Sequence, residues 1–127
     1  MPDPNSQVSA SQESTSAKNA AAKTVLVIED EQALALGLRD ALEHAGYNAH
    51  LCLDGAAAAG AIAEYNPDLL VLDLMLPGKN GLDVLRDLRA AGNKIRVLIL
   101  SALASEEDLL VGFQLGADDY MKKPFSP

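Results

Sequence analysis

Apolar and polar positions along the chain follow two alternating patterns. Short unbroken aliphatic runs occupy residues 24–28, 69–72 and 95–100, and runs of this length are typical of strands buried on both faces of a parallel sheet. Residues 48–53 alternate weakly and predict an edge strand, and residues 117–121 predict a short final strand. The pattern therefore predicts five strands, each separated from the next by a segment of different periodicity.

The segments between these strands have apolar residues at helical spacing. They predict helices over residues 34–45, 55–65, 81–92 and 105–116. Asp54 and Ser105 are the expected N-caps of the second and fourth helices. Strands that alternate with helices predict an α/β fold with a doubly wound parallel sheet.

Right-handed crossovers place the C-terminal ends of all parallel strands at one edge of the sheet, which is where open α/β folds bind ligands. The residues that follow the predicted strands are polar at every position: Glu29-Asp30, Asp54, Asp73, Ser101 and Lys123. The plainest interpretation of Asp73 alone is a strand-capping residue in the turn before Gly78. The joint placement of carboxylates, a hydroxyl and a lysine at one edge favours a functional site.

The carboxylates of Glu29, Asp30 and Asp73 would repel one another unless a cation lay between them. Oxygen ligands of this kind suit Mg²⁺. No His or Cys accompanies them to suggest zinc. Lys123 adds a positive charge and Ser101 a hydrogen-bond donor. A carboxylate in such surroundings is suited to phosphoryl transfer, with Asp73 as the nucleophile.

Composition narrows the class of protein. The formal net charge of −8 argues against binding of nucleic acid or of an anionic membrane by this chain itself. Cys52 is the lone cysteine and is expected to be a buried structural thiol. Residues 1–23 are poor in large apolar side chains and predict a disordered tail before a domain at residues 24–127. The chain has neither a signal peptide nor a membrane span, so a cytoplasmic location is expected.

From Thr24 onward the chain resembles the receiver domain of bacterial two-component response regulators. The matching motifs are VLVIEDE at residues 25–31, LDLMLPG at 72–78 with Gly81, Ser101-Ala102, and GADDYMKKPF at 116–125. The resemblance implies the strand order 2-1-3-4-5 and a phosphoryl group accepted from a sensor histidine kinase. Motif details are most similar to the branch whose output domain is a winged-helix transcription factor. Such an output domain, which would bind DNA, would lie outside this chain.

The resemblance also implies roles for individual residues. Asp73 would be the phosphoacceptor, and Asp30 and Asp73 would bind Mg²⁺ directly. Glu29, where the family more often has Asp, would assist through water, and the Met75 carbonyl would be a further ligand. The phosphate-binding and switch residues would be Ser101, Ala102, Tyr120 and Lys123.

The sequence departs from the family in two respects. In the winged-helix branch the residue after Asp108 is usually basic and pairs across a homodimer formed by the last helix–strand face, whereas here it is Leu109. By the same resemblance, the positions that admit or orient an attacking water are Met75 and Leu103. Both are apolar, which predicts self-catalysed dephosphorylation that is slow compared with the rapid chemotaxis-type receivers. A receiver also has a fifth helix, and Ser126-Pro127 has the pattern of its start. We expect a fragment truncated before that helix, with an apolar patch near Leu38.

Two other functions are compatible with an aspartate at a strand end. A hydrolase of the haloacid dehalogenase type places a second acid two residues after its nucleophile, but Met75 occupies that position. A pseudo-receiver, which binds partners without phosphorylation, would normally lack one of the acids, the lysine or the hydroxyl, and this chain has all of them. A phosphorylatable switch is therefore the leading hypothesis.

Overall fold

The computed structural model describes residues 22–102 and 105–123. These residues form one parallel sheet with the strand order β2-β1-β3-β4-β5. The strands are β1 (Thr24–Ile28), β2 (Asn48–Cys52), β3 (Leu69–Asp73), β4 (Arg96–Ser101) and β5 (Asp119–Lys122). The helices are α2 (Gln32–His44), α3 (Ala58–Tyr65), α4 (Gly81–Ala90) and α5 (Glu106–Gln114). The predicted fold class and strand order are confirmed.

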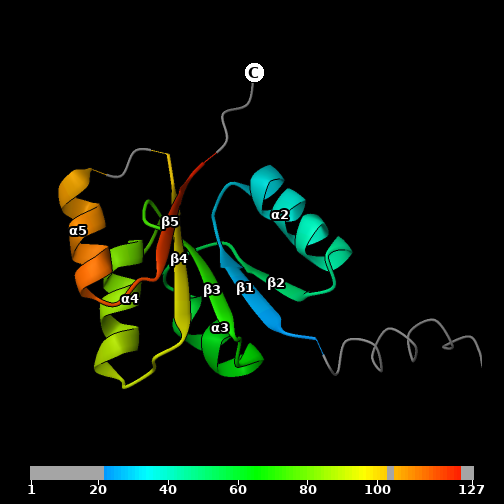
Figure 1. Cartoon of the computed structure of the whole chain (residues 1–127), viewed down its shortest axis with the longest axis horizontal. Helices are drawn as coiled ribbons and strands as arrows, with labels where there is room; N and C mark the ends of the chain where they lie inside the picture. The colour runs from blue at the N-terminus through cyan, green and yellow to red at the C-terminus, as the bar shows by residue number, and fades with distance from the viewer. Residues whose placement is uncertain (1–21, 103–104, 124–127) are drawn as a thin grey trace, which may run out of the picture.

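The helices lie on both faces of the sheet (Figure 1). Side chains alternate along each strand, so that Leu26 and Ile28 of β1 belong to the core cluster that includes residues of α3 and α4, and Leu109 and Leu115 pack against the same cluster. Val25 and Val27 point to the other face and pack with Leu residues of α2. The unbroken aliphatic runs are therefore explained by a sheet whose central strands are buried on both faces.

Local hydrogen bonds explain where several elements begin. The second predicted helix begins later than expected, at Ala58, because the Asp54 carboxylate accepts from the Ala57 N–H and caps a preceding turn instead. The final strand begins at Asp119, since Asp118 first exchanges hydrogen bonds with the backbone of Val97. The third predicted helix begins at Gly81 as expected and is capped by Asn80. The predicted Ser105 cap is confirmed by a 3.0 Å hydrogen bond from the Asp108 N–H.

Cys52 has the structural role expected of it. It is buried at the end of β2, and its thiol donates to the backbone carbonyl of Asp54 at 3.2 Å. Burial raises the pKa of this thiol above its ordinary value. The predicted N-terminal tail lies almost wholly outside the described residues, as does the expected start of a fifth helix at Ser126-Pro127.

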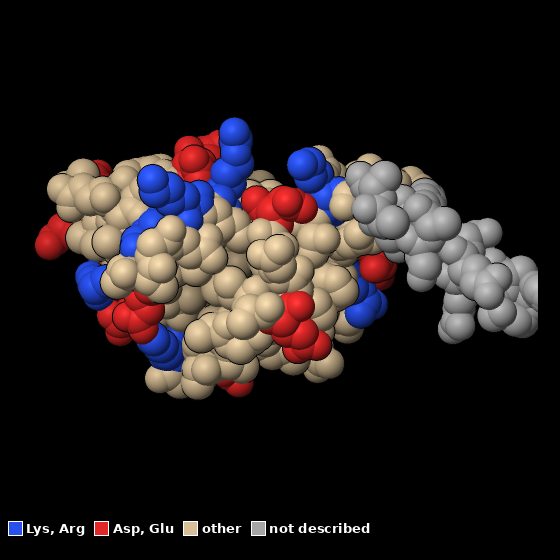
Figure 2. Space-filling model, turned by 90° about the horizontal axis from the view of Figure 1, so that it is seen from below, with Lys and Arg blue, Asp and Glu red and all other residues tan. Residues whose placement is uncertain are grey.

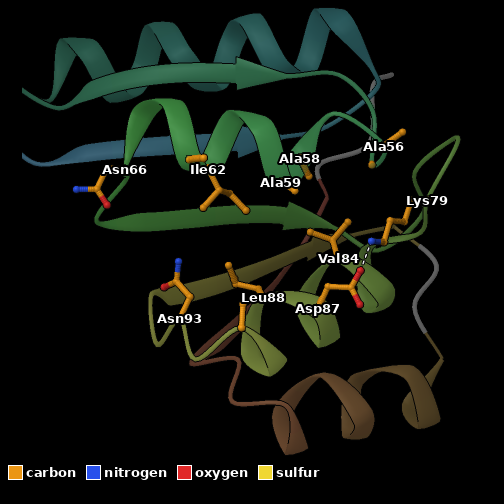
Figure 3. Close-up of a pocket in the computed structure, with 13 residues that line it drawn as sticks. Ala56, Ala58, Ala59, Ile62, Asn66, Lys79, Val84, Asp87, Leu88 and Asn93 are labelled. Atoms are coloured by element: carbon orange, nitrogen blue, oxygen red, sulfur yellow. Dashed lines mark hydrogen bonds and ion pairs between the residues drawn. The ribbon is translucent and has the colours of Figure 1, made fainter.

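Alanine side chains of α3 leave a groove between that helix and α4 (Figure 3). Its volume is about 330 Å³. The side chains of Ile62, Val84 and Leu88 point into it, and the ion pair between Lys79 and Asp87 closes one end. Basic and acidic side chains are interspersed on the face of the molecule seen in Figure 2. Within the described ranges, no helix is long and apolar enough to cross a bilayer.

The loop after β2 lies directly against the loop after β3. A Cβ atom built on Gly55 would lie 1.6 Å from the backbone carbonyl oxygen of Lys79, a distance that no side chain can occupy. The Gly55 N–H also donates to the Pro77 carbonyl at 3.2 Å. Glycine is therefore required at position 55 by close backbone approach.

Two glycine substitutions should have opposite effects on stability. Gly55→Ala should lower the free energy of unfolding by at least ~2 kcal/mol, because the two loops must separate. Gly37→Ala, in the exposed middle of α2 with nothing near its Cβ position, should raise it by roughly 0.5–1 kcal/mol. Urea denaturation of the two variants measures both effects. Equal stabilities would show that the loops are not packed in this way.

Candidate functional site

Three acidic residues meet at the C-terminal edge of the sheet. Glu29 directly follows β1, Asp30 comes next, and Asp73 is the last residue of β3, the strand paired with β1. One carboxylate oxygen from each residue lies within 4.8 Å of the others. Glu29 and Asp73 are fully buried, and Asp30 is exposed. The strand order therefore brings together the acids that the sequence placed at this edge.

Lys123 joins this acidic cluster from the end of β5. Its ammonium nitrogen lies 2.9 Å from Asp73 Oδ2 and 2.9 Å from Glu29 Oε1, and it donates to Glu29 Oε2 at 3.0 Å. A third carboxylate, that of Glu31, lies 3.9 Å away. The backbone N–H of Lys123 donates to the carbonyl of Ser101. Lys123 thus partly neutralises two buried carboxylates that would otherwise repel each other.

Backbone groups hold both buried carboxylates in place. Asp73 Oδ1 accepts a hydrogen bond from the Met75 N–H at 3.0 Å, and Glu29 Oε2 accepts one from the Glu31 N–H at 2.8 Å. Behind Asp73, a Cβ atom on Gly81 would lie 2.2 Å from the Asp73 carbonyl oxygen. The start of α4 can approach the strand that carries Asp73 this closely only because residue 81 is glycine.

The electrostatics of the cluster shift two pKa values. Burial raises the pKa of the Glu29 carboxyl above its ordinary value, against the hydrogen bonds from Lys123 and the Glu31 N–H, which lower it. Burial alone would lower the pKa of Lys123, but its close contacts with the Glu29 and Asp73 carboxylates outweigh that effect and raise it. Lys123 therefore stays charged, whereas keeping Glu29 ionised in the folded protein costs free energy.

Three buried oxygens at this edge have no hydrogen-bond partner among the described residues. They are Glu29 Oε1, Asp73 Oδ2 and Ser101 Oγ. The first two lie at ion-pair distance from Lys123 but outside hydrogen-bonding alignment. Buried oxygens of this kind are costly unless a further group satisfies them. A donor set made only of carboxylate oxygens, with Asp30 open to solvent, fits a hard divalent cation such as Mg²⁺.

The remaining predicted residues take different positions. Ser101 is the buried last residue of β4, and Ala102 follows it. Tyr120, in β5, is half-buried and packs against the core. The Met75 side chain is 59% exposed, and its backbone N–H contacts the Asp73 carboxylate. Asp54 lies at the same edge but is not a member of the acidic cluster, because its carboxylate caps the turn before α3.

The structure adds residues that the sequence analysis did not assign to the site. Glu31 completes the acidic shell around Lys123, and the EDE run at residues 29–31 was the available signal. Gly81 was expected at a helix start and in a family motif. Its close approach to Asp73 was not expected, because it depends on how α4 packs against β3 and not on a local sequence pattern. The groove between α3 and α4 contains none of the acidic cluster.

The comparisons with known proteins agree on one family. The response regulator receiver domain family matches residues 25–127 of this chain. The chain is therefore a response regulator receiver domain. Its curated relatives include response regulator MprA of Mycobacterium avium, which is 42% identical over 102 residues, covering 80% of this chain and 45% of that protein. The chain thus spans less than half the length of the relatives it matches.

Solved structures show the same fold. The receiver domain of the Francisella response regulator 1452 is 36% identical, with a TM-score of 0.75 over 82% of this chain and 86% of that one. The BeF3-activated receiver domain of Klebsiella pneumoniae RstA is 30% identical, with a TM-score of 0.74 over 82% and 88% of the two chains. The receiver domain fold is thereby shown for this chain.

Stability without a divalent cation should depend on pH through Glu29. Its folded-state pKa is raised, so its favourable contribution is complete below the ordinary value of 4.5 and is lost as the pH rises through the raised value. Relative to Glu29→Gln, the wild-type chain should therefore lose stability over that window. Urea denaturation in the presence of a chelator, at a series of pH values, measures the difference.

The control is Glu43→Gln, which removes a carboxylate from the exposed surface of α2. If the stability difference between the wild type and Glu43→Gln changed with pH by the same amount, the effect could not be assigned to the burial of Glu29.

Proposed function

We propose that Asp73 accepts a phosphoryl group from the phosphohistidine of a sensor histidine kinase. The observation that carries this proposal is the surroundings of the Asp73 carboxylate. One oxygen is held by the Met75 N–H, and the other lies 2.9 Å from the Lys123 ammonium without a hydrogen bond. In the transfer, an Asp73 oxygen forms the new bond to phosphorus while the bond from phosphorus to the histidine nitrogen breaks.

The other residues of the edge have supporting roles in this proposal. Asp30 and Asp73 would hold Mg²⁺ with the Met75 carbonyl, and Glu29 would assist through water. When bound, the cation would neutralise charge on the phosphoryl oxygens. Lys123 would bind a phosphoryl oxygen. The backbone N–H of Ala102, which follows Ser101 at the same edge of the sheet, would be a further phosphate-binding group. This chemistry makes the chain a signalling domain that catalyses its own phosphorylation.

Phosphorylation would be reported through Ser101 and Tyr120. The Ser101 hydroxyl is buried and without a partner among the described residues, so a phosphoryl oxygen would provide one. Its movement would make room for Tyr120, which is half-buried on β5. By analogy with its relatives, the full protein would be a cytoplasmic regulator of transcription. The DNA-binding function would belong to an output domain rather than to the receiver domain itself.

The α5–β5 face is the proposed homodimer surface. Leu110, Phe113 and Met121 are 59%, 45% and 50% exposed, respectively, and give this face an apolar character. Leu109, which the sequence analysis placed in the position of the usual dimer salt bridge, is instead half-buried and packs against the core. Contacts between two copies would therefore involve Leu110 rather than Leu109.

Acetyl phosphate with Mg²⁺ should add one phosphoryl group to the wild-type chain and none to Asp73→Asn. Asp30→Ala should slow the reaction by about tenfold or more, because the loss of even an outer partner of a metal ion costs about that much in affinity or activity. Intact-mass spectrometry measures the product. The control, Asp83→Asn, removes an exposed carboxylate whose ion-pair partner is Arg86 and should react like the wild type.

An equal mass gain in Asp73→Asn would overturn the assignment of the phosphoacceptor. No mass gain in the wild-type chain would instead favour a domain that binds partners without phosphorylation.

The aspartyl phosphate should persist well beyond seconds when no phosphatase is present. The side chain of Met75 is exposed at the site and offers no hydrogen bond to orient an attacking water. Met75→Asn, which supplies such a group, should shorten the lifetime, whereas Met75→Leu should leave it unchanged. Phosphate release after removal of acetyl phosphate measures all three proteins. A wild-type lifetime of a few seconds would contradict this expectation.

A further inference from the structure

The segment from α5 to β5 meets the site at both of its ends. The helix α5 begins a few residues after Ser101, and β5 ends next to Lys123. The connection between them, residues 115–118, lies at the opposite edge of the sheet, because Asp118 pairs with Val97 at the start of β4 (Figure 1). Residues 105–122, which we call the α5–β5 unit, therefore have two ends at the site and a bend far from it.

The α5–β5 unit has few fully buried residues. Gly112 is the only fully buried residue of α5, and no residue of β5 is fully buried. A Cβ atom on Gly112 would lie 2.5 Å from a side-chain atom of Ile99, so the helix approaches the sheet closely at this residue, with the half-buried Leu109 and Leu115 packed on the same core. Elements with few buried contacts open and shift at low cost, so a small number of specific contacts must determine where this unit sits.

Arg89, in the last turn of α4, makes three hydrogen bonds around the bend. Its Nε donates to the Leu115 carbonyl at 2.8 Å, its Nη2 to the Gly116 carbonyl at 2.9 Å and its Nη1 to the Asn93 carbonyl at 2.9 Å. The first two acceptors belong to the bend, and the third belongs to the segment that leaves α4. One side chain thus ties the bend to the helix beside the groove.

The chemistry of these contacts requires arginine. The C-terminal ends of helices leave backbone carbonyls without partners and carry a partial negative charge. Leu115 is the C-cap of α5, and Asn93 lies just beyond the end of α4. A planar guanidinium can donate to three carbonyls in fixed directions from three separate nitrogens, whereas the three N–H donors of a lysine ammonium all lie on one nitrogen. The single guanidinium of Arg89 therefore donates hydrogen bonds to carbonyls at the C-terminal ends of both helices.

Gly116 is adapted to the same contact. Its φ of +90° is one that residues other than glycine rarely adopt, and a Cβ atom there would lie 3.1 Å from Arg89 Nε. The bend is therefore shaped so that the guanidinium can reach two consecutive carbonyls.

We infer that Arg89 is a positioning residue that holds the bend of the α5–β5 unit fixed while the two ends respond to the site. A change at Ser101 or Lys123 then turns α5 and β5 about a held point and alters the whole exposed face. Without the hold, the same change would be absorbed locally. This inference rests on the proposed phosphorylation of Asp73 for its signal, but not for the anchoring itself.

Hydrogen–deuterium exchange of the full chain tests both parts. In the absence of ligands, Arg89→Lys should speed exchange at residues 113–119 by about tenfold or more, the effect of losing one charge-assisted hydrogen bond. Exchange in β1 and β3 should stay unchanged. The control, Arg86→Lys, retains the charge on an exposed neighbouring turn, where the ion-pair partner is Asp83, and should resemble the wild type throughout.

The second arm uses Mg²⁺ with beryllium fluoride as the probe of the site. In the wild type and in Arg86→Lys, the probe should change exchange at residues 29–31 and 73–75 and also at 110–119. In Arg89→Lys the change near the site should remain, and the change at 110–119 should be lost. This pattern is one that a merely stabilising residue would not produce.

Three results would overturn the inference. They are unchanged exchange at residues 113–119 in Arg89→Lys, equal acceleration there and in β1 and β3, and local acceleration with the probe response at 110–119 intact. If the probe changes nothing at 29–31 and 73–75 in the wild type, the proposed function fails instead. The exchange rates without ligand then still decide whether Arg89 anchors the bend.

Discussion

The contact of Lys123 with Glu29 and Asp73 is the interaction on which the rest of this structure depends. Two fully buried carboxylates at the ends of adjacent strands would be a severe electrostatic penalty without a cation. The ammonium group comes from the end of the edge strand β5, which has no fully buried residue. A single charge thus links the least packed strand to the most buried ones. Any group that competes for Asp73, whether a metal ion or a phosphoryl group, also changes how β5 is held.

Close backbone approach is the second constraint, because it leaves the loops around Asp73 little freedom. Gly81 allows α4 to begin against the Asp73 carbonyl, and Gly55 allows the loop after β2 to press on Lys79. The acidic cluster therefore has a stiff wall on the side of α3 and α4. On the side of α5 and β5, the described structure is held by few buried contacts and by Arg89. A displacement at the site would therefore meet less resistance on the side of α5 and β5 than on the side of α3 and α4.

The fold and most of the site could be predicted from the sequence, because parallel topology determines where strand ends meet. Glu29, Asp30, Asp73 and Lys123 come together as soon as the strand order is known. Prediction failed where single residues depend on rotation or on distance between segments. Leu109 and Leu110 are adjacent, but the turn of the helix packs Leu109 against the core and exposes Leu110. Asp54 is a cap, as expected, but it accepts from the Ala57 N–H and caps a turn that precedes α3, so the helix begins later than predicted. The hydrogen bonds from Arg89 to the bend span 26 and 27 residues of sequence and leave no local pattern.

The aliphatic core also determines which optical signals the protein offers. The chain has no Trp and three Tyr, so its intrinsic near-ultraviolet fluorescence comes from tyrosine. Tyr47 is exposed, and Tyr65 is stacked on His50 with ring centroids 3.9 Å apart, outside the acidic cluster. Of the three tyrosines, only Tyr120 lies on β5, the strand directly before Lys123. An event at the site that moves β5 can therefore change the summed tyrosine emission through Tyr120, with Tyr47 and Tyr65 contributing a background signal. The domain can report its own state to a spectroscopist without any label.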